Sequence, residues 1–159
     1  MAQSILADAE LQVCVVVRDL EKARQKFGLL FGIEKFNVYT VDTRELAGVT
    51  YRGQPGDYRV TVAMAKIGSW HLELLVPERG SSIYQDFLDR HGEGVQHLGF
   101  FVNESYPAVV DDFTARGFEH LLGGPILGTK RNGRFDYYDT QEKMGVLLEL
   151  LDMPDGPPR

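Results

Sequence analysis

The sequence contains only one cysteine, Cys14, among its 159 residues. No intrachain disulfide can form, and such a chain fits a reducing compartment such as the cytoplasm. No stretch approaches the roughly 18 consecutive apolar residues that a membrane-spanning helix needs. The first residues, MAQSILADAE, also lack the basic and apolar segments of a secretory leader. We therefore predict a soluble, unprocessed cytoplasmic protein.

Long basic runs are absent as well, and the formal net charge is -6. This charge argues against nucleic acid or an anionic membrane as the main partner. The chain has no glycine-rich nucleotide loop, no Cys-x-x-Cys pair and no Ser-His-Asp order, which disfavours three common classes of site. Its hydrophobic content of 43% is sufficient for one compact domain or for two small modules that share a core.

Strand and helix patterns occur in the same order twice along the chain. Alternating or β-branched runs predict strands, and apolar residues at helical spacing between a cap and a glycine predict helices. The predicted strands are 11–17, 35–41, 58–67 and 71–76, then 95–102, 119–124, 134–140 and 145–151, with a helix after the first strand of each set. We predict one α+β domain, 1–159, with module one at about 10–78, module two at about 93–152 and a connecting helix at about 81–91.

Polar residues stand at matching places in the two modules. Gln12 and His97 lie in the first strands, and Glu73 and Glu149 lie in the last strands. Burial of an unpaired carboxylate is very costly, so two glutamates within runs of Val and Leu need a positive partner. If the paired βαβββ modules pack about a pseudo-twofold axis into a curved open sheet, the four side chains meet in one cup. A divalent cation held there would supply the missing charge.

Three further residues share strand faces with these four, because side chains alternate along a strand. Cys14 follows Gln12 on the same face, His71 precedes Glu73, and Phe101 follows His97. We predict that they line or support the substrate side of the cup, with Cys14 as a small buried hydrophobic residue.

The segments QVCVVVRDLEKA, HLELLVP, GEGVQHLGFFV and YYDTQEKMGVLLELL resemble the vicinal oxygen chelate superfamily, which includes glyoxalases, bleomycin resistance proteins and extradiol dioxygenases. The resemblance covers about residues 10 to 152, and the sequence around these segments is most similar to methylmalonyl-CoA epimerase. It implies a homodimer of this fold and one divalent metal ion, bound by Gln12, Glu73, His97 and Glu149.

One ligand departs from the epimerase pattern, because those epimerases usually have His where this chain has Gln12. A set of Gln, Glu, His and Glu instead resembles the zinc-using type of glyoxalase I. Oxygen-rich donors with one imidazole suit Zn²⁺, Co²⁺, Ni²⁺, Mn²⁺ or Mg²⁺. They match the two-His, one-carboxylate site of non-haem iron oxygenases poorly.

The resemblance implies a metal-dependent isomerase or epimerase that transfers a proton at a carbon next to a carbonyl, through a metal-stabilised enolate. Glu149 is the predicted base, and Asp57 is the candidate second base. The substrate would be a small molecule with adjacent oxygens: an acyl-CoA, a keto compound or a glutathione adduct. Two alternatives stay open, a glyoxalase I-type lactoylglutathione lyase and a metal-free ligand-binding or resistance protein of the same fold.

Five cationic residues, Arg52, Arg59, Lys130, Arg131 and Arg134, lie in loops near predicted strand ends. They could contact a carboxylate or phosphate of the substrate. Charged residues in such places more often form a solvated rim, and we favour that interpretation for most of them.

Overall fold

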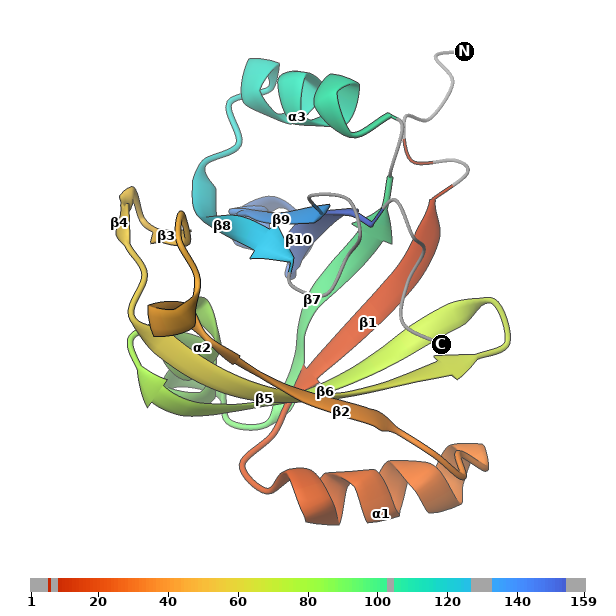
Figure 1. Cartoon of the computed structure of the whole chain (residues 1–159). Helices are drawn as coiled ribbons and strands as arrows, with labels where there is room; N and C mark the ends of the chain where they lie inside the picture. The colour runs from red at the N-terminus through yellow and green to blue at the C-terminus, as the bar shows by residue number, and fades with distance from the viewer. Residues whose placement is uncertain (1–5, 7–8, 103–104, 127–132, 154–159) are drawn as a thin grey trace.

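The computed structural model describes residues 6, 9–102, 105–126 and 133–153 (Figure 1). Its strands are β1 (Glu10–Val16), β2 (Asn37–Asp42), β3 (Thr50–Tyr51), β4 (Gln54–Pro55), β5 (Tyr58–Ile67), β6 (Trp70–Gly80), β7 (Gly94–Phe101), β8 (His120–Ile126), β9 (Gly133–Tyr138) and β10 (Leu147–Asp152). Its helices are α1 (Leu20–Phe31), α2 (Ile83–His91), α3 (Tyr106–Ala115), α4 (Gln141–Met144) and the 3-10 turn η1 (Thr43–Glu45). None of these helices is long and apolar enough to cross a membrane.

The described strands form one continuous curved sheet in the order β2-β5-β6-β1-β7-β10-β9-β8-β3-β4. At its centre β1 pairs antiparallel with β7, the first strands of the two modules. On the outer sides β1 pairs parallel with β6 and β7 pairs parallel with β10, so each module adds its last strand beside its first. Counted outward from the centre, each module thus places its strands in the same order: first, last, third and second, as β1-β6-β5-β2 and β7-β10-β9-β8. The predicted fold class, paired βαβββ modules in a curved open sheet, is confirmed.

A short hairpin formed by β3 and β4 lies within residues 43–57, a turn-rich segment for which the sequence predicts irregular structure. Thr50 and Tyr51 pair with Gly123 and Leu122 of β8, so a segment of the first module extends the far edge of the second. The hairpin turn contains Gly53 at a φ of 72°, a conformation that glycine adopts without strain. A two-residue strand has no periodicity to recognise, and its partner is distant in sequence.

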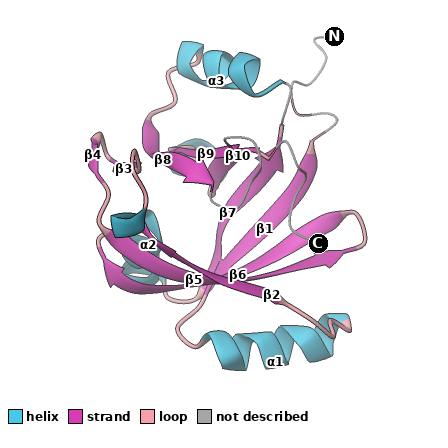
Figure 2. Ribbon diagram, in the orientation of Figure 1, coloured by secondary structure: helices cyan, strands magenta, loops and turns pink. Residues whose placement is uncertain are grey.

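Two helices cover the outer face of the sheet, one on each module, and lie at opposite ends of the molecule (Figure 2). Helix α1 begins at its cap Asp19 and ends at Gly32, as predicted, and packs Ala23 and Phe27 beside Leu72 and Leu74. The second helix packs its apolar side chains in the same way; these contacts join Tyr106, Val109 and Phe113 of α3 to Tyr138, Leu148 and Leu150. The helices leave the concave inner face of the sheet for the cup.

Helix α2 closes one end of the concave face. Ser82 caps it, accepting a hydrogen bond from the backbone N–H of Gln85 at 3.2 Å, and Gly92 ends it. Its buried residues Ile83, Tyr84 and Leu88 join the inner core. The connecting helix is thus part of the wall of the cup as well as a link between modules.

Candidate functional site

The side chains of Gln12, Glu73, His97 and Glu149 converge on one point of the concave face. His97 Nε2 lies 3.2 Å from Glu73 Oε2 and 3.3 Å from Glu149 Oε2. Gln12 Nε2 lies 3.1 Å and 3.2 Å from the same two carboxylate oxygens, and 3.5 Å from His97 Nε2. All four residues are at most 6% exposed, so the two carboxylates are withdrawn from water.

Strand register explains how four distant residues meet. Cys14 of β1 lies opposite Glu73 on β6 and opposite His97 on β7, so it separates those two residues. Gly99 of β7 separates the other two, because it lies opposite Gln12 on β1 and opposite Glu149 on β10. Two short residues therefore allow the four longer side chains to lean toward one another over the centre of the sheet.

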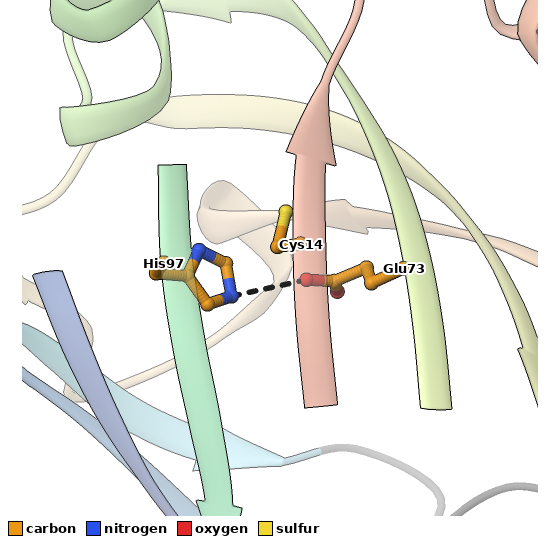
Figure 3. A group of neighbouring side chains, drawn as sticks. All are labelled: Cys14, Glu73 and His97. Atoms are coloured by element: carbon orange, nitrogen blue, oxygen red, sulfur yellow. Dashed lines mark ion pairs between the residues drawn. The ribbon is translucent and has the colours of Figure 1, made fainter. Parts of the chain in front are cut away.

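Figure 3 shows half of this arrangement, with Cys14 on β1 between Glu73 and His97, and Glu73 directed toward the imidazole. The possible ligand atoms of these three buried residues lie within 4.8 Å of one another. Burial raises the pKa of the Cys14 thiol well above its usual value, and the nearby Glu73 carboxylate raises it further. The thiol is therefore held in its neutral form, which is a poor metal ligand.

Gln96 sets the orientation of the imidazole, a role that the sequence analysis did not foresee. Its side-chain oxygen contacts His97 Nδ1, and Gln96 itself is 1% exposed. An acceptor at Nδ1 keeps a proton on that nitrogen, so Nε2, the atom that faces the carboxylates, is the one available to a metal ion. Gln96 stands next to His97 in the sequence, but alternation predicts that it points to the other face, so no local signal marks it.

The electrostatics of the cluster follow from burial and opposed charges. Burial lowers the pKa of His97, but hydrogen bonds and attraction from Glu149 and Glu73 outweigh it and raise the pKa to about 9. Burial raises the pKa of the Glu149 carboxyl, and the charge of His97 offsets part of this rise. Without a metal ion, a protonated imidazole thus supplies the positive partner that the sequence analysis required.

A cavity of about 280 Å³ opens above the cluster and is lined by Gln12, Glu73 and Glu149 at its base. Two tyrosines of its wall reach toward the same point. Tyr84 O–H donates to the Tyr137 hydroxyl at 2.9 Å, and the Tyr137 hydroxyl lies 3.4 Å from His97 Nε2. Neither tyrosine is predicted from the sequence, because a tyrosine in an amphipathic helix or strand has the pattern of an ordinary core residue.

The other predicted site residues are His71, Phe101, Cys14 and Asp57. His71 is fully buried and contacts Glu10 at 3.0 Å, and its ring packs against that of Phe101 with centroids 5.4 Å apart. His71, Cys14 and Phe101 are not among the residues that line the cavity. Asp57 lies outside the cavity as well, with 71% of its side chain exposed and an ion pair to Arg79. The structure therefore brings together the four predicted ligands but not Asp57.

Comparison with protein-family models identifies the superfamily of the chain. The model of the glyoxalase/bleomycin resistance protein/dioxygenase superfamily matches residues 11–138, which is most of the chain. The chain belongs to this superfamily. The matched residues include Gln12, Glu73 and His97, and the superfamily contains enzymes as well as proteins that are not enzymes. No curated protein sequence matches the chain.

Solved structures with the superfamily fold include methylmalonyl-CoA epimerases. The epimerase from Mycobacterium tuberculosis has 20% sequence identity and a TM-score of 0.65, with 99% of this chain and 93% of that chain covered. A hypothetical protein from Bacillus halodurans has 18% identity and a TM-score of 0.63, over 96% and 99% of the two chains. An epimerase variant from Streptomyces coelicolor in complex with 2-nitronate-propionyl-CoA has 23% identity and a TM-score of 0.61, over 89% and 94%. At these identities the likeness shows the fold.

The donor spacing can be tested against that of a metal ion. Ligands about 2.1 Å from a common ion lie about 3.0–3.4 Å from their neighbours in octahedral or tetrahedral geometry. Four of the contacts among these side chains, at 3.1–3.3 Å, fall in this range, and the contact between Gln12 and His97, at 3.5 Å, lies just above it. A half-turn of the Gln12 amide places its oxygen where its nitrogen lies, which completes a donor set of one imidazole nitrogen and three oxygens. The residues present therefore fit a divalent cation.

Proposed function

We propose that this protein is a divalent-metal-dependent isomerase that moves a proton at a carbon next to a carbonyl, the type of reaction that a methylmalonyl-CoA epimerase performs. The convergence of Gln12, Glu73, His97 and Glu149 at metal-ligand spacing carries the proposal. An iron-dependent dioxygenase is disfavoured, because a single imidazole among three oxygen donors does not match the two-His, one-carboxylate site of non-haem iron oxygenases.

The proposed ion would be held by His97 Nε2, by the carboxylates of Glu73 and Glu149, and by the amide oxygen of Gln12. When bound, it would act as a Lewis acid that lowers the energy of negative charge on a substrate carbonyl oxygen. The protein's own contribution is to hold the ligands in place. Gln96 orients the imidazole, and Gly99 leaves space for the Glu149 carboxylate.

Glu149 is the proposed base, since its buried carboxyl has a raised pKa and lines the cavity. A two-base reaction also needs a group on the opposite side of the carbon. Glu73 occupies the matching place in the other module and reaches the same point, whereas Asp57 points away toward Arg79. We propose that Glu73 and Glu149 share the proton transfer from the two sides.

Tyr137 supplies a hydrogen-bond donor at the same point. Burial and the charge of Glu149 raise its pKa well above the usual value for tyrosine, so the phenol stays protonated. Its hydroxyl accepts from Tyr84 and is thereby aligned toward the ligand cluster. A neutral donor held in place before the reaction stabilises a developing oxyanion without reorganisation.

Two measurements on the purified protein test this proposal. Metal analysis after dialysis should give one divalent ion per chain, with Zn²⁺, Co²⁺, Ni²⁺, Mn²⁺ and Mg²⁺ compared for affinity. Incubation with acyl-CoA and keto compounds in deuterated water should then place deuterium at the substrate α-carbon without oxygen consumption. A protein that binds no ion, or one that consumes oxygen during turnover, would contradict the proposal.

Gln12 favours a second candidate, a glyoxalase I-type lyase, because the set Gln, Glu, His and Glu resembles that enzyme. Product formation from the hemithioacetal of methylglyoxal and glutathione separates the two activities. A metal-free ligand-binding protein of this fold is less well supported, because such a protein needs no buried pair of carboxylates beside an imidazole.

We also propose that the protein forms a homodimer, on the superfamily resemblance. The end of α1 exposes apolar side chains that a partner could cover, with Leu29 at 89% and Leu30 at 73% exposed. Light scattering at micromolar concentration would show the mass of the dimer or refute the proposal.

A further inference from the structure

The walls of the cup are apolar on both sides. Beyond the ligand cluster at its base, the cavity is lined from β5 by Val60, Val62 and Met64, and from the second module by Ile126, Phe135 and Leu151. Its volume of about 280 Å³ lies just below the range of about 300–1,000 Å³ that ligand pockets span. The space therefore suits a compact ligand with a hydrocarbon or aromatic body.

The charge of the lining is one-sided. Among the residues that the structure describes, no lysine or arginine lines the cavity, and its charged side chains are Glu73 and Glu149. The described arginines near strand ends pair with acids elsewhere. Arg59 contacts Glu78 at 2.7 Å and Arg52 contacts Asp86 at 3.3 Å, both with about half of the cationic side chain exposed, at 45% and 57%. Arg134 contacts Asp136 at 3.5 Å. Arg52, Arg59 and Arg134 thus form a solvated rim, as predicted, whereas Lys130 and Arg131 lie outside the described residues.

This balance restricts which substrates can be buried there. A divalent ion carries two positive charges, and the carboxylates of Glu73 and Glu149 compensate both. A free carboxylate on the substrate would add a negative charge among apolar walls, and no cation among the described lining residues could pair with it, which is unfavourable. A carbonyl oxygen needs only a hydrogen bond, and the lining residues Tyr39, Tyr58 and Tyr137 carry hydroxyls that can act as neutral donors.

We propose that the cup selects a carbonyl compound with an apolar or aromatic body and no free carboxylate on the part that it encloses. The inference rests on the proposed function and narrows its substrate class. It includes ketones and thioesters with hydrocarbon acyl groups. It excludes dicarboxylic acyl groups of the malonyl type and glutathione adducts whose carboxylates enter the cup.

Two probes with the same chelating group test this selection on the Co²⁺-loaded protein. Benzohydroxamate presents an uncharged phenyl ring, and 4-carboxybenzohydroxamate adds one carboxylate to that ring. Titration calorimetry and the visible Co²⁺ spectrum report binding without any need for turnover. We expect the uncharged probe to bind about tenfold or more tightly than the carboxylated one, because only the latter brings an unpaired charge into the cup.

A cation placed in the wall should reverse the preference. Val41 of β2 is half-buried and lines the cavity, so Val41→Lys introduces an ammonium group at the edge of the cup. This variant should gain affinity for the carboxylated probe. Val38→Lys is the matched control, since Val38 lies on the same strand, is 44% exposed and does not line the cavity; it should leave both affinities unchanged.

The outcomes separate this inference from the proposed function. Equal or tighter binding of the carboxylated probe by the unaltered, Co²⁺-loaded protein overturns the substrate class while the metal site stands. Failure of both probes to bind to the loaded protein also overturns it. A protein that takes up no Co²⁺ instead overturns the proposed function itself.

Discussion

Gly99 and Glu149 lie opposite each other in the pairing of β7 with β10, and a Cβ on Gly99 would stand 2.9 Å from Glu149 Oε2. It would also stand 3.2 Å from Gln12 Cβ. Two of the four proposed ligands thus need the absence of a side chain at position 99. The requirement is one of space, because Gly99 does not adopt a positive φ.

Gly99→Ala should therefore weaken metal binding. The added methyl group displaces the Glu149 carboxylate or strains the centre of the sheet, and overpacking of this kind typically costs about 1–3 kcal/mol of stability. We expect a loss of about tenfold or more in metal affinity, measured by competition with a chelator. Gly94→Ala on the same strand is the control, since its nearest contact would be Phe87 at an ordinary 3.8 Å. Equal metal affinity in the two variants would contradict the packing argument.

His97→Ala should release the metal ion or weaken its binding by more than about 10²-fold. Loss of a residue that only hydrogen-bonds to a metal ligand already lowers metal affinity by about 10–100-fold, and loss of the ligand itself should cost more. Metal content after dialysis measures the effect. His91→Ala, at the exposed end of α2, should retain one ion per chain. Full metal content in the His97 variant would show that His97 is not a ligand.

Glu149→Gln should lower turnover by about 10²–10⁴-fold, the range for loss of a general base, with a further decrease if less metal is bound. Rates normalised to bound metal separate these effects. Asp57→Asn should leave metal content and turnover unchanged, because Asp57 is exposed and pairs with Arg79. A large decrease in turnover of the Asp57 variant with its metal intact would instead support Asp57 as the second base.

Tyr137→Phe should keep the metal ion but lower turnover by about 10²-fold, because it removes a donor aligned with the cluster. The neighbouring Tyr138→Phe is the matched control, since Tyr138 packs on the outer face with α3. Single-turnover rates and metal content distinguish a lost donor from a disturbed fold. An unchanged rate in the Tyr137 variant would remove the proposed donor role.

The stability of the metal-free protein should fall as pH rises. The pKa of His97 is raised from 6.5 to about 9. The stability that this group contributes to the folded state is therefore fully present below pH 6.5 and is lost as pH rises through 9. Its contribution amounts to up to about 3 kcal/mol. The raised pKa of Glu149 also lowers the stability of the metal-free protein as pH rises above 4.5. Denaturant titrations between pH 6 and 10, with and without metal, should show the decline in the metal-free protein only. A rise in metal-free stability over this range would contradict the coupling.

The sequence by itself determined the order of the elements and the inward direction of the four ligands. Strand side chains alternate with a period of two, which is a local rule, so Gln12, Glu73, His97 and Glu149 could be assigned to one face before any strand was paired. Local caps likewise set the bounds of the helices, as Asp19 and Gly32 do for α1. The high cost of an unpaired buried carboxylate then made a positive partner at this place a physical requirement.

Only the tertiary structure decided which residues stand around those four. The register of β7 against β1 and β10 placed Gly99 between Gln12 and Glu149. Helix α2 and strand β9 brought Tyr84 and Tyr137 to the cluster. The tertiary structure also paired Asp57 with Arg79 and joined β3 to β8 across the two modules. These relations depend on register and on contacts distant in sequence, which a local periodicity does not encode.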